Sequence, residues 1–292
     1  MGSLCLVLHG KQAQNPAVRA AVAAARASGH QVEVRVTWEA GDATRLAAEA
    51  SRLGFSRVAA GGGDGTINEV ATGLLTAKVP GKQGPALAVI PLGTANDFAH
   101  ACGIPLEPGA AIELASTAEP RPIDVGQVTG RPFINVATGG FGTKITVETR
   151  AELKKVLHGA AYLITGVTHF SELRPVRARF TGPEFSWSGE LLVLAIGNGR
   201  QAGGGHVLCP EALVDDGLLD IGILPDVAPG ERAAALDALL QEGTAALRRH
   251  TVTARLPWVE LASDEPVQVN LDGEPIEGKQ LRFEILPGAL QA

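Results

Sequence analysis

The segment VAAGGGDGTINEVATGLL, residues 58–75, joins a short apolar run to an amphipathic pattern through the glycine-rich run GGGDG. The apolar residues belong to a predicted strand over 55–60, and apolar residues at helical spacing predict a helix over 66–77. Thr66 and Glu69 have the spacing of a capping box, which would start that helix at the threonine. A strand, a turn of nearly bare backbone and a helix are therefore expected.

The N-terminal part of the chain repeats this alternation of strand and helix. Strands are predicted over 3–9, 31–37, 55–60 and 86–91, and helices over 17–28, 42–53, 66–77 and 95–102. Asp42 is expected to be the N-cap of its helix. Because strands that alternate with helices at this spacing are joined by right-handed crossovers, we expect a Rossmann-like α/β domain with a parallel sheet.

From about residue 121 the chain consists mainly of short β-like runs separated by Gly, Pro and Asp. These runs are RPIDVGQV (121–128), RPFINVA (131–137), VRARFT (176–181), ELLVLAIG (190–197), LLDIGIL (218–224), PVQVNL (266–271) and LRFEIL (281–286). Their rhythm predicts an antiparallel sandwich or barrel, interrupted by helices near 150–170 and 229–248.

The expected fold class is therefore α/β followed by β. An N-terminal α/β nucleotide domain is predicted over residues 1–122 and a C-terminal β-sandwich domain over 123–292. The last few residues are allowed to return to the first domain. Ligands favour the cleft between two such domains, so the active site is expected there.

Composition and charge argue against several classes of function. The formal net charge of −6 argues against nucleic-acid binding and against general attraction to anionic membranes. Cys5, Cys102 and Cys209 form no C-x-x-C pair, so reduced thiols are expected rather than zinc or a disulfide framework. The sequence shows no apolar run of the ~18–20 residues that a membrane span needs, and no secretory signal at its start. A soluble, cytoplasmic protein is expected.

The run GGGDG, residues 61–65, has three interpretations. A turn that needs positive φ explains one or two glycines but not four. A dinucleotide fingerprint needs a third glycine where Thr66 stands, and a Walker loop needs a following Gly-Lys-Ser/Thr. Backbone N–H groups at the start of a helix bind phosphate, and bare glycines let the phosphate approach closely. The run is therefore predicted to hold phosphates, with Asp64 as a partner for Mg²⁺.

The same run, together with PLGTANDFA (91–99), resembles the diacylglycerol kinase catalytic domain of bacterial lipid kinases. Further matches are IDVG (123–126), NVATGGFG (135–142), CPEALVDDGLLDIGIL (209–224) and LDGEP (271–275). Their order is similar to that of the YegS-like lipid kinases across essentially the whole chain. The resemblance implies ATP-dependent phosphorylation of a lipid hydroxyl. GGDG alone is less specific, because NAD kinases and phosphofructokinases carry similar loops.

The resemblance also implies which residues contact the nucleotide. The phosphates are expected at Gly61, Gly62, Gly63, Asp64, Gly65, Thr66 and Ile67. Thr94 in PLGTANDF and Thr37 at the end of the strand over 31–37 match two other nucleotide contacts of the family. Asn96 and Asp97 are interpreted either as buttresses of the second loop or as a polar helix start.

Phosphoryl transfer also needs a base near the attacking hydroxyl, and a carboxylate of the second domain is expected to supply it. In VQVNLDGEPI, Asp272-Gly273 is a dipeptide typical of hairpin turns, and Glu274 lies just beyond it. Glu274 matches the proton acceptor of the family. Burial of this carboxyl group near a lipid chain would raise its pKa toward the range useful for a base.

A second cation site is implied by LVDDGLL, residues 213–219. In the family, the matching loop binds a structural Mg²⁺ through one aspartate carboxylate and neighbouring carbonyls. By position these ligands are the carbonyls of Leu213 and Leu218 and the carboxylate of Asp216, with Asp215 as an alternative or an additional ligand. Without the resemblance, Asp216-Gly217 reads as another hairpin turn.

The function predicted from the sequence is an ATP- and Mg²⁺-dependent lipid kinase, with Ca²⁺ as the other candidate cation. Phosphatidylglycerol is the first candidate acceptor and diacylglycerol the second, bound at the membrane surface or extracted from it. The alternatives are a kinase of a soluble acceptor such as NAD and a sensor that binds ATP without turnover. The helix over 153–170 is expected either to face the core or to line the lipid entrance, in which case the protein is peripherally associated with the membrane.

Overall fold

The computed structural model describes residues 2–140, 175–226 and 250–292. The chain divides into two compact units, which we call unit 1 and unit 2. Unit 1 comprises Met1–Val125 and Pro287–Ala292, and unit 2 comprises Gly126–Leu286. The helices predicted near 150–170 and 229–248 lie outside the described residues.

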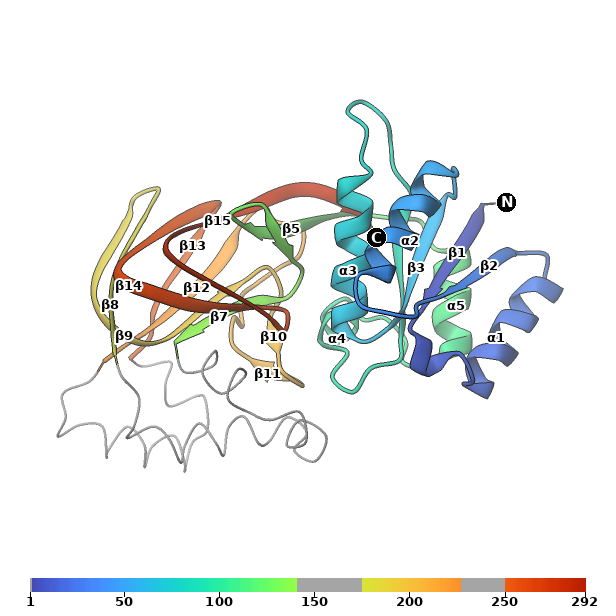
Figure 1. Ribbon diagram of the computed structural model, residues 1–292, viewed down its shortest axis with the longest axis horizontal. Coiled ribbons are helices and arrows are strands. Elements are labelled where there is room, and N and C mark those ends of the chain that lie inside the picture. The colour runs from blue at the N-terminus through green and yellow to red at the C-terminus, as the bar shows by residue number, and fades with distance from the viewer. Residues whose placement is uncertain (1, 141–174, 227–249) are drawn as a thin grey trace. The chain divides into compact units, whose positions relative to one another are not determined.

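Unit 1 contains a four-stranded parallel sheet (Figure 1). Its strands are β1 (Ser3–Leu8), β2 (Gln31–Val36), β3 (Arg57–Gly62) and β4 (Ala86–Pro91), in the order β2-β1-β3-β4. Its helices are η1 (Gly10–Gln12), α1 (Pro16–Ala27), α2 (Asp42–Arg52), α3 (Asp64–Thr76), α4 (Asp97–Ala101) and α5 (Pro108–Thr117). The α/β class with a parallel sheet is therefore confirmed.

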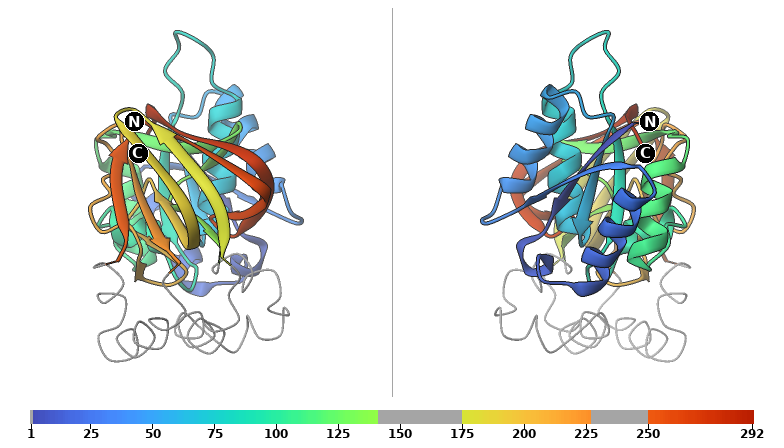
Figure 2. Two further views of the ribbon diagram at one scale, coloured as in Figure 1. Left: turned by 90° about the vertical axis from the view of Figure 1, so that its left-hand side faces the viewer. Right: turned by 90° about the vertical axis from the view of Figure 1, so that its right-hand side faces the viewer.

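Helices cover both faces of this sheet (Figure 2). On one face, Leu4, Leu6 and Leu8 of β1 form a core with residues of α1 and α5. On the other face, α2 and α3 pack against each other and against β1 and β3. Cys5 and Val7 of β1 are buried as well, because successive side chains of a strand point to opposite faces. A sheet covered on both sides leaves only its strand ends for a ligand.

The predicted N-caps of two helices of unit 1 differ from those observed. The third helix begins at Asp64 with Gly63 as its N-cap, so Thr66 lies inside the first turn and the capping-box prediction is wrong. The second helix begins at Asp42 itself with Gly41 as its N-cap, so Asp42 is not the N-cap either. The carboxylate of Asp42 instead accepts hydrogen bonds from the chain that precedes the helix.

The helix α5 is absent from the prediction. Glu107 caps it by accepting hydrogen bonds from the backbone N–H groups of Gly109 at 2.9 Å and Ala110 at 2.7 Å, and these bonds lower the pKa of Glu107. Pro108 stands at its first position. A proline at the first helical position is a known start signal, so this helix was recognisable from its sequence.

Unit 2 is built from antiparallel strands. Its strands are β6 (Arg131–Phe133), β7 (Val136–Gly140), β8 (Val176–Gly182), β9 (Phe185–Gly197), β10 (Gln201–Ala202), β11 (His206–Val207), β12 (Leu219–Pro225), β13 (Val252–Leu256) and β14 (Trp258–Leu271). The strands β5 (Pro122–Val128) and β15 (Glu274–Gln291) run from one unit into the other.

The main sheet has the order β13-β12-β9-β7-β14-β15-β5-β6. The long strands β9 and β14 are bridged twice, by β7 near one end and by β8 farther along. Large apolar side chains such as Phe180, Leu194 and Phe283 fill the core of this unit. The predicted mostly-β second part of the chain is therefore confirmed.

Candidate active site

Three loops meet at the carboxyl ends of the strands β1, β3 and β4. The N–H group of His9 donates to the carbonyl of Gly61 at 2.8 Å, and the N–H group of Leu92 donates to the carbonyl of Gly62 at 2.8 Å. The side-chain amide of Gln12 donates to the carbonyl of Leu92 at 3.0 Å. These bonds hold the loops together at the edge of the sheet where open α/β folds bind ligands.

The two glycine loops predicted to contact the nucleotide touch each other. A Cβ atom at Gly93 would lie 2.4 Å from the Cα atom of Gly63, which no real contact allows. A Cβ atom at Gly62 would lie 2.3 Å from Oγ1 of Thr66, so this glycine lets the first turn of α3 fold back onto its strand. The packing of backbone on backbone explains Gly63 and Gly93, and the side chain of Thr66 explains Gly62, all without any ligand.

Gly65 is different. It lies exposed in the first turn of α3, and a Cβ atom there would meet nothing within 4 Å. Its φ lies outside the left-handed region, so neither the backbone conformation nor packing against the chain requires a glycine. In the part of the chain that the structure describes, no side chain caps this helix. The first turn therefore offers open space and N–H groups to an anion.

Asp64 connects this loop to the next one. Its carboxylate accepts hydrogen bonds from the N–H groups of Asp97 at 3.1 Å and Phe98 at 3.0 Å, at the start of α4. Asn96, with φ of 52°, accepts a hydrogen bond from the N–H group of Gly93 at 2.9 Å and donates to its carbonyl at 3.1 Å. Asn96 thus buttresses the second loop, and Asp64 has a structural role that the sequence analysis did not foresee.

The two threonines of the prediction lie on either side of these loops. Thr37 follows β2; its N–H group donates to the carbonyl of Leu8 at 3.0 Å, and its hydroxyl accepts from the N–H group of Gly10 at 3.1 Å. Thr94 is exposed in the turn between β4 and α4. All the residues predicted to contact the nucleotide therefore belong to unit 1 and lie at the carboxyl ends of its strands or just beyond them.

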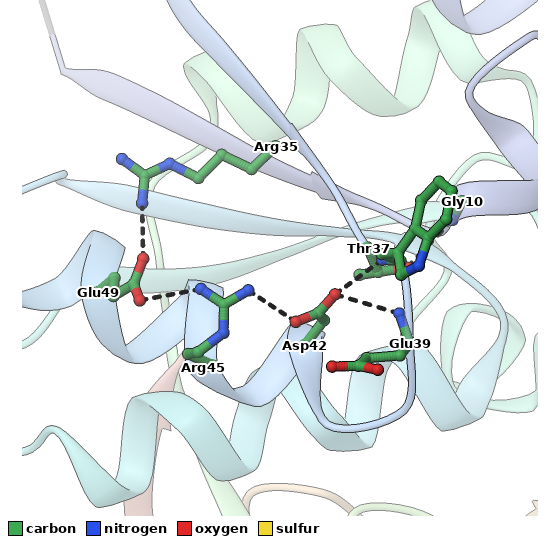
Figure 3. Close-up of polar contacts among 8 residues, drawn as sticks. Gly10, Arg35, Thr37, Glu39, Asp42, Arg45 and Glu49 are labelled. Carbon is green, nitrogen blue, oxygen red and sulfur yellow. Dashed lines mark hydrogen bonds and ion pairs between the residues drawn. The ribbon is translucent and has the colours of Figure 1, made fainter.

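Asp42 holds the segment after Thr37 in place (Figure 3). One oxygen of its carboxylate accepts hydrogen bonds from the N–H groups of Trp38 at 2.8 Å and Glu39 at 3.2 Å, and the other binds Arg45 at 2.6 Å. The hydrogen bond from Arg45, followed by those from Trp38 and Glu39, lowers the pKa of Asp42 from 3.8 to about 2. The carboxylate is therefore charged at neutral pH.

In unit 2, Asp272 and Gly273 form the predicted hairpin turn between the paired residues Leu271 and Glu274. Both turn residues have positive φ, 49° at Asp272 and 107° at Gly273, as two-residue hairpins require. Glu274 is exposed directly after the turn.

The turn is fastened to the segment between β6 and β7. The carboxylate of Asp272 accepts hydrogen bonds from the N–H groups of Ile134 at 2.6 Å, Asn135 at 3.1 Å and Val136 at 3.3 Å. Such a carboxylate, which accepts several backbone N–H groups, forms strong charge-assisted bonds. The position of Glu274 is therefore set by its neighbour in the turn.

Buried amide side chains surround this attachment, and the sequence analysis missed them. Asn198 donates from its side chain to the carbonyl of Ile134 at 2.8 Å, and its N–H group donates to the carbonyl of Asn135 at 2.9 Å. Asn270 accepts from the N–H group of Gly273 at 2.6 Å. The signal that could have found them is that NGR and NLDG each place an asparagine close to a glycine at a strand end.

At the predicted structural cation site, the guanidinium of Arg255 lies against Asp216. Asp216 accepts a hydrogen bond from the N–H group of Leu218 at 3.0 Å and pairs with Arg255, which also binds Asp220 at 3.2 Å. Leu213 and Asp215 are exposed. Oxygen ligands of this kind suit a hard cation, and a cation that binds Asp216 would compete with Arg255 for its carboxylate.

The interpretation of Asp216-Gly217 as a hairpin turn is wrong, because β12 pairs with β9 and β13 and not with the strand that precedes it. Within residues 2–140, 175–226 and 250–292, no group of three or more His, Cys, Asp and Glu side chains is arranged to hold a metal ion.

Comparison with known proteins accounts for both units. Residues 4–128 match the family model of the diacylglycerol kinase catalytic domain, and residues 137–292 match the YegS C-terminal NAD kinase beta sandwich-like domain. The chain belongs to the YegS-like lipid kinases. The resemblance stated from the motifs is thereby confirmed, as is the fold class, with a β-sandwich-like second domain.

Curated relatives match nearly the whole YegS-like chain. It is 57% identical over 286 residues to "Probable lipid kinase YegS-like" of Pseudomonas aeruginosa (strain UCBPP-PA14). The alignment covers 98% of this chain and 92% of the relative. The chain is 55% identical over 285 residues to the protein of the same name in Pseudomonas syringae pv. syringae (strain B728a), covering 98% and 91%.

A solved structure has the same fold. A crystal structure described as a diacylglycerol kinase from Bacillus anthracis (strain Sterne) has a TM-score of 0.79 and 23% identity, and covers 99% of this chain and 96% of that chain. The protein is thus a lipid kinase, a phosphotransferase that uses ATP and an alcohol group as acceptor. None of the helices that the structure describes is long and apolar enough to cross a membrane.

Proposed function

We propose that this YegS-like lipid kinase transfers the γ-phosphate of ATP to a hydroxyl group of phosphatidylglycerol, with diacylglycerol as the second candidate acceptor. The observation that carries the proposal is the first turn of α3, where Gly65 leaves open space at the start of a helix that no described side chain caps. Helix starts of this kind bind phosphate, because their N–H groups and the helix dipole both attract negative charge.

In this proposal Gly61, Gly62, Gly63, Asp64, Gly65, Thr66 and Ile67 hold the phosphates, and Thr37 and Thr94 contact other parts of the nucleotide. The packing of the glycine loops supports it, because the loops are fixed before the nucleotide binds. A preformed phosphate site is what phosphoryl transfer requires, since the protein contributes mainly positioning and charge neutralisation.

Glu274 is proposed as the proton acceptor. The hydroxyl oxygen of the lipid forms a bond to the γ-phosphorus, the bond to the β-phosphate oxygen breaks, and ADP leaves with the electron pair. The hydroxyl proton passes to the carboxylate of Glu274. Two features support this role: the side chain is exposed to an incoming hydroxyl, and the Asp272–Gly273 turn fixes its backbone.

Mg²⁺ is proposed to bind together with the nucleotide. The carboxylate of Asp64 is proposed as its protein ligand. When bound, the ion supplies neutralisation of the phosphate charge. Asp64 already accepts two backbone N–H bonds, and a carboxylate has lone pairs left for further partners. Asp64 therefore fits this role while it keeps the two loops together.

The structural cation at Leu213, Asp216 and Leu218 remains a proposal that Arg255 tests directly. If a cation can bind there, removing the guanidinium should strengthen its binding, because Arg255 competes for Asp216. Calorimetric titration of Arg255→Gln with Mg²⁺ and with Ca²⁺, beside the wild type, measures this. Equal heats for both proteins would exclude Asp216 as a ligand.

The acceptor is identified by phosphate transfer from labelled ATP to a panel of lipids in detergent micelles. The panel contains phosphatidylglycerol, diacylglycerol and NAD, with Glu274→Ala as the inactive control. We expect label on phosphatidylglycerol that is lost in the variant. Label on diacylglycerol alone would correct the acceptor, label on NAD alone would contradict a lipid substrate, and ATP binding without transfer would indicate a sensor.

A further inference from the structure

Trp38 is the most exposed large apolar side chain among the described residues, with 94% of its surface accessible. Single exposed apolar residues are common, but an indole ring is large, and leaving it in water forgoes the burial of much apolar surface. The other two tryptophans have aromatic or cationic partners: Trp187 lies 5.7 Å from Phe180, and Arg282 lies 4.5 Å above Trp258.

The backbone that carries Trp38 is firmly held. Its N–H group donates to Asp42 at 2.8 Å, and the preceding Thr37 is bonded to Leu8 and Gly10. A Cβ atom at Gly10 would lie 2.5 Å from the carbonyl oxygen of Thr37, so the two loops pack backbone to backbone. The backbone of the segment is therefore fixed before a ligand binds, so ordering it adds little to the entropic cost of binding.

The sheet places the backbone just before Trp38 two strands away from the strand that leads into the proposed phosphate site. Leu8 of β1 is paired with Val36 of β2 on one side and with Gly61 of β3 on the other. Adjacent strands are about 4.8 Å apart, so the ends of β2 and β3 are separated by roughly 10 Å. The ribose and α-phosphate of a nucleotide can bridge such a distance between phosphates at α3 and a base beyond Thr37.

We propose that Trp38 stacks on the adenine ring of ATP and contributes to the affinity and specificity for the nucleotide. This inference rests on the proposed binding of the phosphates at residues 61–67. Aromatic side chains stack well on bases, which present a flat π-face, and the contact covers an indole ring that the protein itself leaves bare. Thr37, one residue before, is already proposed to contact the nucleotide.

The charges around Trp38 argue against the other obvious occupant, a membrane surface. The charged residues tied to this segment are Glu39, Asp42 and Arg45 (Figure 3). Lys11 follows Gly10, so acids and bases are balanced here, and the whole chain carries a net charge of −6. A single aromatic residue without an excess of basic neighbours is a weak membrane anchor. A nucleotide base, which is neutral and flat, suits this surface better.

Fluorescence difference spectra between the wild type and Trp38→Phe isolate the emission of Trp38 from that of the two other tryptophans. We expect ATP to quench this emission in the absence of lipid, and inorganic triphosphate, which has no base, to leave it unchanged. If vesicles of phosphatidylglycerol instead shift the emission to shorter wavelength without nucleotide, Trp38 inserts into the membrane and the stacking proposal is wrong.

Kinetics provide the second readout. Trp38→Ala should raise KM for ATP roughly five- to 100-fold, with the loss in KM rather than in kcat, and Trp38→Phe should recover much of it because phenylalanine also stacks. Leu53→Ala is the matched control, since Leu53 is likewise exposed but lies after the far end of α2; its KM should match the wild type. An unchanged KM in Trp38→Ala overturns the proposal.

The failure of this inference is distinguishable from failure of the proposed function. Calorimetric binding of ATP and label transfer to lipid, with no quenching and no change in KM, would refute stacking and leave the kinase mechanism intact. Absence of ATP binding in the wild type would refute both.

Discussion

The dipeptide Asp-Gly occurs as Asp64-Gly65 in unit 1 and as Asp272-Gly273 in unit 2. The two glycines are explained by different features of the structure. Gly273 has φ of 107° in a two-residue hairpin, a conformation that other residues adopt only with strain. Gly65 lies in a helical turn with φ outside that region and with open space where its side chain would project. The backbone conformation requires a glycine at position 273 and not at position 65.

The two aspartates, in contrast, do the same thing. Asp64 accepts hydrogen bonds from two backbone N–H groups at the start of α4, and Asp272 accepts from three between β6 and β7. Each carboxylate fastens its turn to a segment distant in sequence. Gly65 is required neither by its backbone conformation nor by packing, whereas Asp64 has a structural role. Such a glycine is therefore stronger evidence for a ligand than the aspartate beside it.

The largest effect is expected from the residue that follows the second pair. Glu274→Gln should lower the rate of phosphate transfer by about 10²- to 10⁴-fold, because an amide cannot take up the hydroxyl proton. The matched control is Glu277→Gln, an exposed carboxylate on the same strand. Comparable rates for both variants would show that Glu274 is not the base, and Tm should stay unchanged in each because both side chains are exposed.

The next largest effect is expected on stability. Asp272→Ala should lower the free energy of unfolding by about 3 kcal/mol, because it leaves three backbone N–H groups without their charged acceptor. Asp264→Ala, at an exposed position of β14, should change it by less than about 0.5 kcal/mol. Urea denaturation of both variants measures the difference, and equal stabilities would contradict the attachment of the turn.

The glycines themselves test the comparison. Gly273→Ala should lower the free energy of unfolding by roughly 1–2 kcal/mol because of its positive φ. Gly65→Ala should leave stability unchanged or raise it by up to about 1 kcal/mol, since alanine favours the helix, yet it should weaken ATP binding. Calorimetric titration with ATP, together with thermal unfolding, separates the effects. Gly65→Ala with normal ATP affinity would remove the main support for the phosphate site.

The smallest effect concerns acid stability in the segment that carries Trp38. The pKa of Asp42 is lowered in the folded protein from 3.8 to about 2, so its contribution to stability is present above about pH 4 and lost as the pH falls towards 2. Asp42→Asn lacks this titration, and its Tm should therefore fall less steeply over that range. Parallel profiles of Tm against pH for the two proteins would show that folding does not lower the pKa of Asp42.

Much of unit 1 was predictable because its signals are local. The strand over 86–91 was predicted with its observed bounds, and the strand over 31–37 within one residue, since alternation and buried runs depend only on the chain's own periodicity. The start of α3 was placed two residues late, and Asp42 was wrongly expected to cap α2. Each depends on whether a carboxylate bonds to its own helix or to another segment.

The site followed the same division. The motifs were sufficient to predict the family and the residues of the glycine loop, because residue types and their order are properties of the sequence alone. The contact of Asn135 with Asp272 and the pairing of Arg255 with Asp216 were not predicted, because these partners are 137 and 39 residues apart along the chain. Such contacts exist only after the strands have paired.

By itself, the sequence determined the alternation of strands and helices in unit 1, the β-rich second part and the chemical groups available for phosphoryl transfer. Only the tertiary structure decided what each group does: Asp64 and Asp272 fasten loops, Gly65 leaves room, and Trp38 remains bare on a rigid segment. The physical reason is that periodicity acts between neighbours in the chain, whereas hydrogen-bond partners and exposure depend on residues that folding brings together.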